Sequence, residues 1–237
     1  SNPSRAVSNP FVVEQNGLTV DGNFFLSLCD IEDGGVRIGG QLEQAYTFSN
    51  TGDDEVLLEF FKYADIDLTG SSDFEDDGGG RKVIDGVDWV FQTDLPVAGD
   101  VQTELVAIRI EGGEDLPGAY GLDQYDPVLD DNPLLEQIRT GGSLSNTVLG
   151  DGADADELVD TGNGLDLAVA RGKFLRIPPG ESASISVYTV YGQLSFDQLT
   201  ELTISGPTLE LSPTGFLVVE NSQLESQIQF SLESNSV

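Results

Sequence analysis

The stretch Ser182-Ala183-Ser184-Ile185-Ser186-Val187-Tyr188-Thr189-Val190-Tyr191 carries the clearest structural signal in this chain. Apolar residues alternate with small polar residues along it, and a period of two is typical of a β-strand with one buried face. Its odd-numbered residues are mostly apolar, so they predict one wall of a sandwich core. The residues expected to meet in that core are Phe48, Leu58, Phe60, Ile185 and Val187.

Other short apolar bursts repeat this signal along the chain. Residues 42–48 alternate, stop at a turn around Asn50-Thr51-Gly52, and resume over residues 56–63. Helix signals are few: Asn132 is a good N-cap, Pro133 suits the first helical position, and a glycine pair at 141–142 ends the segment. Residues 195–202 predict a second short helical turn. The sequence therefore predicts an all-β, jelly-roll-like β-sandwich with one or two short helices.

The domain organisation predicted is an N-terminal strand segment, residues 1–20, and a single β-sandwich domain, residues 21–237. Residues 1–10 are polar and would be mobile alone, whereas Asn16-Gly17 is a hairpin turn signal between two apolar runs. We expect this segment either to pair within its own domain or to insert into the sheet of a neighbouring subunit. The interface residues this predicts are Phe11, Val12, Val13, Leu18 and Val20.

The charge balance excludes several partners. The chain has 42 acidic and 10 basic residues, a formal net charge of −32. Such a surface repels the phosphates of nucleic acids and anionic lipid head groups, so neither is an expected partner. The same charge strains the compact state by self-repulsion, which high salt, bound divalent cations or both would relieve.

Calcium is the metal that the composition allows. The chain has no histidine and one cysteine, Cys29, so an intrachain disulfide is impossible and any metal must be held by oxygen. Two acidic stretches, residues 65–88 and 150–166, read as long loops. Neither matches the EF-hand register, and the alternative is a solvated acidic loop. The candidate calcium ligands are Asp73, Asp76, Asp77, Asp151, Asp154, Asp156 and Asp160.

No pattern in the sequence predicts an enzyme. Without histidine the Ser-His-Asp and Cys-His arrangements are absent. A carboxylate pair could serve a glycosidase, but among 42 acidic residues any one pair is uninformative. The segment 120–126, which contains Tyr120 and Tyr125, is expected to lie in a loop and is a candidate carbohydrate contact, so polysaccharide is one partner considered.

The chain is expected to be exported. It begins at Ser1 and contains no methionine, which predicts that a leader or a tag has been removed. No apolar run approaches the ~20 residues of a membrane helix, so membrane insertion is not expected.

Two stretches resemble exported bacterial β-sandwich surface proteins of the kind often carrying PEP-CTERM sorting tails. The first leads from Phe48-Ser49-Asn50-Thr51-Gly52 to Tyr63-Ala64-Asp65-Ile66-Asp67-Leu68-Thr69-Gly70, and the second is Phe174 to Ile185 with its Pro178-Pro179-Gly180-Glu181 turn. The resemblance implies a sandwich fold and a surface location, but no reaction. The chain departs from the pattern at residues 234–237, which are no sorting tail.

Together these features predict an extracellular structural protein, a self-associating subunit of a surface filament, sheath or matrix assembled by β-strand addition. The alternative is a calcium-dependent carbohydrate-binding or adhesive module.

Overall fold

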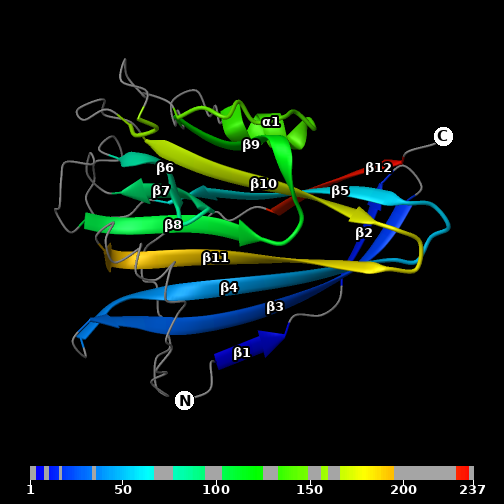
Figure 1. Ribbon diagram of the computed structural model, residues 1–237, viewed down its shortest axis with the longest axis horizontal. Helices are drawn as coiled ribbons and strands as arrows, with labels where there is room; N and C mark the ends of the chain where they lie inside the picture. Colours follow the sequence, from blue (N-terminus) through cyan, green and yellow to red (C-terminus); the bar gives the residue numbers. More distant parts are fainter. Residues whose placement is uncertain are drawn as a thin grey trace.

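The computed structural model describes residues 4–7, 11–15, 18–33, 36–66, 77–93, 103–124, 133–148, 156–159, 166–194 and 228–234. These residues form two antiparallel sheets that pack face to face, with one short helix on the outside of the smaller sheet (Figure 1). The predicted all-β sandwich is therefore confirmed. The second helical turn predicted over residues 195–202 lies outside the described residues.

The larger sheet has eight strands. Seven of them follow the order β1-β3-β4-β11-β8-β7-β6, and the eighth, β2, pairs with β3 beside β1. Its strands are β1 (Ser4–Val7), β2 (Phe11–Gln15), β3 (Leu18–Asp33), β4 (Val36–Asn50), β6 (Gly78–Ile84), β7 (Val87–Thr93), β8 (Thr103–Glu111) and β11 (Ser182–Leu194). The smaller sheet has the order β12-β5-β10-β9. Its strands are β5 (Val56–Asp65), β9 (Glu114–Gln124), β10 (Leu167–Ile177) and β12 (Ile228–Ser234).

The main core lies between the two sheets and is built by the predicted alternation. On β11, Ile185 and Val187 point inward and are 1% and 0% exposed, while Ser184 before them is exposed and Ser186 between them is half-buried. The five residues expected to share one core do so, with Tyr46 ring-stacked near Phe48. A side chain of this size contributes roughly 1.5–3 kcal/mol when fully buried, so this core is the main source of stability.

A second apolar cluster occupies part of the outer face of the larger sheet. It includes Trp89 and Phe91 of β7 and Leu105 of β8, all at most 2% exposed. The strands β7 and β8 therefore bury side chains on both of their faces. This explains why residues 105–110 read as a nearly continuous apolar run rather than a strict alternation.

Two polypeptide crossings between the sheets are tied together by Asn50, the last residue of β4. Its Nδ2 donates to the carbonyls of Asp54 (2.7 Å) and Ile177 (2.8 Å), and its Oδ1 accepts from the Gly52 amide (2.9 Å). Its own carbonyl accepts from the Gly180 amide (2.9 Å). Asn50 is 2% exposed. The β4–β5 and β10–β11 turns thus meet at one side chain.

The single helix found in the described part of the chain, α1 (Pro133–Arg139), begins at the predicted proline. Gly141 has a positive φ of 72°, and its amide donates to the Ile138 carbonyl (3.1 Å), a conformation that favours glycine at a helix end. Leu134, Leu135 and Ile138 pack on Phe61 and Tyr63 of β5. Among the described residues no helix has the length and apolarity needed to cross a membrane.

Strand β3 runs without a break through Gly22-Asn23, because Gly22 pairs with Phe48 on one side and with Phe11 on the other. One local prediction was wrong. The acidic stretch 65–88 was expected to be a loop, but it contains β6 and the start of β7. These two strands are joined by Asp85 and Gly86, both with positive φ (49° and 79°), a tight hairpin turn of the Asp-Gly kind.

Candidate functional site

The β6 edge of the larger sheet is covered by a short segment, residues 156–159. Gly80 and Leu158 form an antiparallel bridge, the Arg81 amide donates to the Glu157 carbonyl (2.9 Å), and the Val159 amide donates to the Gly79 carbonyl (2.9 Å). A Cβ on Gly80 would lie 2.6 Å from the Glu157 carbonyl oxygen. Glycine is therefore required where this segment lies against β6.

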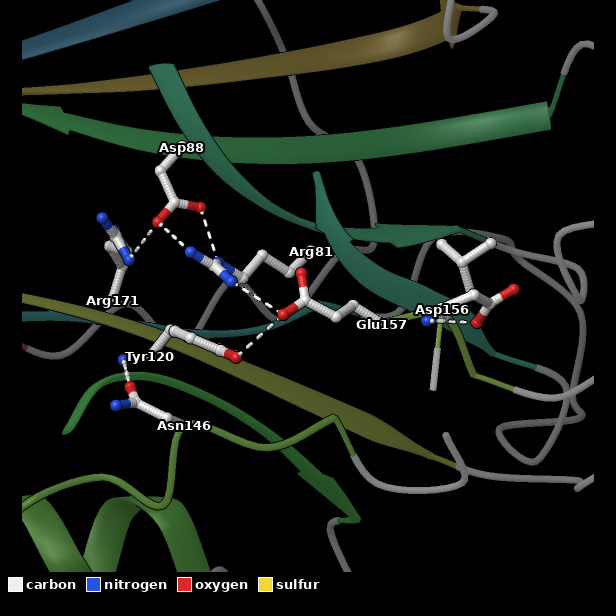
Figure 2. A network of polar contacts seen from close by, with 8 residues as sticks. Arg81, Asp88, Tyr120, Asn146, Asp156, Glu157 and Arg171 are labelled. Atoms are coloured by element: carbon white, nitrogen blue, oxygen red, sulfur yellow. Dashed lines mark hydrogen bonds and ion pairs between the residues drawn. The ribbon is translucent and has the colours of Figure 1, made fainter. Parts of the chain in front are cut away.

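A network of charged side chains ties this edge to the smaller sheet (Figure 2). The Arg81 guanidinium donates twice to Asp88, from Nε to Oδ1 (2.9 Å) and from Nη2 to Oδ2 (3.0 Å), and donates from Nη1 to Glu157 Oε1 (2.8 Å). Arg171 of β10 reaches the same Asp88 carboxylate at 2.8 Å. Asp88 thus holds one arginine from each sheet, which makes the network a tie between the two layers.

Tyr120 of β9 completes the network. The Arg81 Cζ lies 4.3 Å from the centre of its ring, and its hydroxyl donates to Glu157 Oε1 (3.3 Å). The hydrogen bonds to Asp88 raise the pKa of Arg81, and burial, followed by the Glu157 charge, raises the pKa of Tyr120. Both groups therefore keep their protons across the physiological range. The residues of this network are therefore suited to joining strands by hydrogen bonds and ion pairs rather than to transferring protons.

The β9 edge of the smaller sheet is covered as well. The Leu122 amide donates to the Thr147 carbonyl (3.1 Å), the Asn146 amide donates to the Tyr120 carbonyl (3.0 Å), and Leu122 forms a parallel bridge with Val148. We call the β6 and β9 edges together the closed side of the sandwich. Its backbone groups are occupied by short irregular segments, which is one way that sheet proteins avoid edge-to-edge aggregation.

The opposite side of the sandwich is built differently. There the larger sheet ends in β1 and β2, the smaller sheet ends in β12, and β12 lies close to β2 as well as pairing with β5 (Figure 1). Among the described residues no segment pairs with the outer edges of these strands. We call these two edges the open side.

The predicted interface residues lie on the open side. Residues 11–15 pair with residues 18–22 of the same chain, from Phe11 opposite Gly22 to Gln15 opposite Leu18. Val12 is 56% exposed, the largest exposure among the large apolar side chains described. The segment thus completes its own sheet in a single chain, and its exchange with a neighbour stays a prediction.

The outer edge formed by β1 and β2 is not a continuous ladder. Val7 is opposite Phe25, and Phe11 is opposite Gly22, so the register changes by one residue between the two strands. Pro10, which has no amide proton, lies in the sequence at this interruption. A register change and a proline both hinder the addition of another flat strand along such an edge.

Two of the seven predicted calcium ligands are described, and both serve the fold. Asp77 Oδ2 accepts from the buried Gln92 Nε2 (2.7 Å) and from the Leu167 amide (3.0 Å), while Gln92 Nε2 also donates to the Ile66 carbonyl (2.8 Å). The exposed Asp156 accepts from the Leu158 amide (3.0 Å). The others, Asp73, Asp76, Asp151, Asp154 and Asp160, lie outside the described residues. Within the described residues no three metal-binding side chains gather, and calcium binding stays a prediction.

Lys62 lies on β5, 4% exposed, directly opposite Arg171 in the ladder with β10. Burial lowers the pKa of its ammonium group to about 8, from 10.5. A cation at this depth costs free energy in the native state. Lys62 lies between Arg171 of β10 and Ile228 of β12 in the ladder, so this buried cation belongs to the part of the smaller sheet next to the open side.

The aromatic residues considered as carbohydrate contacts have other roles. Tyr120 was expected in a loop, but it lies in β9, 8% exposed, beneath Arg81. Tyr125 and Asp126 are outside the described residues. Tyr188 is half-buried on the outer face of the larger sheet, where Arg109 lies 4.4 Å from its ring centre and Glu43 accepts from its hydroxyl (3.3 Å). Burial and the neighbouring Glu111 and Glu43 raise the pKa of Tyr188 to about 12.

The ion network was missed by sequence reasoning, although one signal pointed to it. The run Gly78-Gly79-Gly80-Arg81 places three glycines in a strand next to a cation in a chain with only 10 basic residues. Glycine inside a strand often marks the close approach of another segment.

No family model matches this chain, and no curated protein matches it.

Proposed function

We propose that this protein is an extracellular structural subunit that builds a surface filament, sheath or matrix by β-strand addition along its open side, without catalysing a reaction. The difference between the two sides of the sandwich is the observation that carries this proposal. On the closed side short segments occupy the edges of β6 and β9. On the open side the described residues leave the outer edges of β1, β2 and β12 unpaired.

The charge supports a joint made of backbone rather than of side chains. Two surfaces of a protein with a net charge of −32 repel one another unless counterions intervene. The strength of main-chain hydrogen bonds and of apolar contacts does not depend on the sign of the surface charge. A subunit of this composition is therefore better joined by a shared strand than by docking two acidic faces.

The test compares two exposed valines, one on each side. Val12 of β2 is 56% exposed on the open side, and Val83 of β6 is 53% exposed on the closed side. A lysine on an edge strand discourages pairing with another strand. We expect the wild type to form assemblies in sedimentation velocity and electron microscopy, Val12→Lys to weaken them, and Val83→Lys, which carries the same added charge, to leave them unchanged.

Assembly should also survive ~1 M salt, where the Debye length is about 3 Å and electrostatic contacts are screened. A wild-type protein that stays monomeric at all concentrations and salt levels would overturn the proposal. Loss of assembly in Val83→Lys but not in Val12→Lys would place the joint on the other side.

The calcium-dependent adhesive alternative has one observation in its favour. Residues 156–159 lie along β6, and Asp77 binds the Leu167 amide, so the described ends of both acidic stretches are anchored at the same edge of the molecule. Carboxylate and carbonyl oxygens, in which both stretches are rich, are the ligands that calcium prefers. The melting temperature, measured with and without a chelator at fixed ionic strength, distinguishes this alternative from an acidic edge that is only solvated.

A further inference from the structure

We propose that β12 is the exchanged strand of this protein: residues 228–234 of one copy pair with β5 of the next copy. This inference rests on the proposed function and names the partner, a second copy of the same chain, and the two segments that join.

The connections on the open side distinguish the two possible donors. β2 and β3 are separated by residues 16–17 alone, whereas β12 is separated from β11 by residues 195–227. The probability that a strand meets its own chain falls with roughly the three-halves power of the connecting length. The advantage of pairing within one chain is therefore lower for β12 than for β2.

The acceptor is the edge of β5. The β12 ladder runs from Ile228 opposite Lys62 to Ser234 opposite Val56, and it is antiparallel throughout. On the inward face of that part of β5, the side chains of Val56, Leu58 and Phe60 are at most 1% exposed. Without a strand in the β12 position the outer backbone edge of β5 would be left unpaired beside this core, so the position must be occupied by one copy or another.

The position also lies at the open edge of the smaller sheet, next to the open edge of the larger one. β12 bonds to β5 of the smaller sheet and approaches β2 of the larger one (Figure 1). A strand received there contacts both layers, whereas a strand added outside β1 and β2 would meet a ladder interrupted by a register change. The sequence of β12 alternates Ile228, Phe230 and Leu232 with polar residues, the pattern of a strand with one apolar face.

Cysteine pairs placed on two different molecules test this directly. In a Cys29→Ser background, Glu59→Cys is made in one protein and Ser231→Cys in another, because these residues are directly opposite in the ladder. Opposed Cα atoms in antiparallel strands are about 4.5–5.5 Å apart, within the range of a disulfide. The two proteins are mixed in urea, refolded together in ~1 M salt and oxidised.

The matched control is the N-terminal hairpin. Glu14→Cys and Thr19→Cys, also directly opposite, are treated in the same way. A second pair on β5 and β12, Leu57→Cys with Glu233→Cys, guards against a variant that fails to fold, and circular dichroism monitors each protein. We expect disulfide-linked dimers from both β5–β12 mixtures, and a several-fold lower yield from the hairpin mixture.

Each outcome is decisive. Cross-linking of the hairpin pair alone overturns the assignment of β12 and leaves strand addition standing, with β2 as the donor. If neither pair cross-links although the protein assembles, neither β12 nor β2 is exchanged and the inference is overturned, while the proposed strand addition would have to use the outer edges of the open side. If all proteins remain monomeric, the proposed function and the inference fail together. As a further check, Glu59→Cys and Ser231→Cys in one chain should form an internal disulfide that blocks assembly, and normal assembly of that oxidised protein would contradict the exchange.

Discussion

Replacing Asp88 by asparagine should destabilise the protein by ~3 kcal/mol, because its carboxylate neutralises two arginines at once. Arg171 is 5% exposed at its side chain, and breaking a buried ion pair by removing one partner costs about 3–5 kcal/mol. Arg81 adds little to this loss, since its side chain is 22% exposed and it retains Glu157 at 2.8 Å. Asparagine preserves the shape of Asp88 but presents an amide group where both arginines donate.

The assay is equilibrium unfolding in urea, followed by circular dichroism and tryptophan fluorescence of Trp89. The matched control is Glu55→Gln, because the Glu55–Arg176 pair is shorter (2.6 Å) but exposed at both side chains (35% and 46%). An exposed pair contributes at most about 1 kcal/mol and is weakened by salt. If Asp88→Asn costs less than about 1 kcal/mol, or no more than the control, the network is not the tie between the sheets described above.

Three further predictions follow from the same structure. Asn50→Asp should cost ~3 kcal/mol in urea unfolding, because a carboxylate cannot donate to the carbonyls of Asp54 and Ile177, whereas Asn146→Asp at an exposed position should cost much less. Lys62 has a native pKa of about 8 against 10.5, so the unfolded chain binds more protons between these values and native stability rises with pH. We therefore expect the unfolding free energy of the wild type, measured relative to that of Lys62→Met, to rise by up to ~3 kcal/mol between about pH 7 and pH 10. A difference between the two proteins that does not change with pH would contradict this. If calcium binds, chelation at fixed ionic strength should lower the melting temperature, and an unchanged melt would leave only a solvated acidic edge.

The fold was largely predictable because it depends on a local pattern. Alternation on β11 identified the inward residues Ile185 and Val187, and the proline and glycines around 133–142 located the helix and its end. The unbroken course of β3 through Gly22 could not be predicted, because a glycine inside a ladder and a glycine in a turn look alike in sequence. The length of the paired strand, set by long-range partners such as Phe48, decides between them.

The side-chain network could not be predicted in the same way. Asp88 joins Arg81 and Arg171, which are far apart in sequence and belong to different sheets. In a chain with 42 acidic residues nothing local distinguishes the one carboxylate that binds two arginines. Its role follows from the pairing of β6 with β7 and from the packing of β10 on β7, which are properties of the complete fold.

The long reach of the β5–β12 ladder has a kinetic consequence. Ile228 pairs with Lys62 and Ser234 with Val56, so most of the sequence must be synthesised before this edge is completed. Contacts between distant parts of a chain slow folding, and an unpaired strand edge is prone to aggregation while it waits. We therefore expect a late folding step in which β5 is covered. During that interval, a nascent molecule and its neighbours compete for one and the same edge.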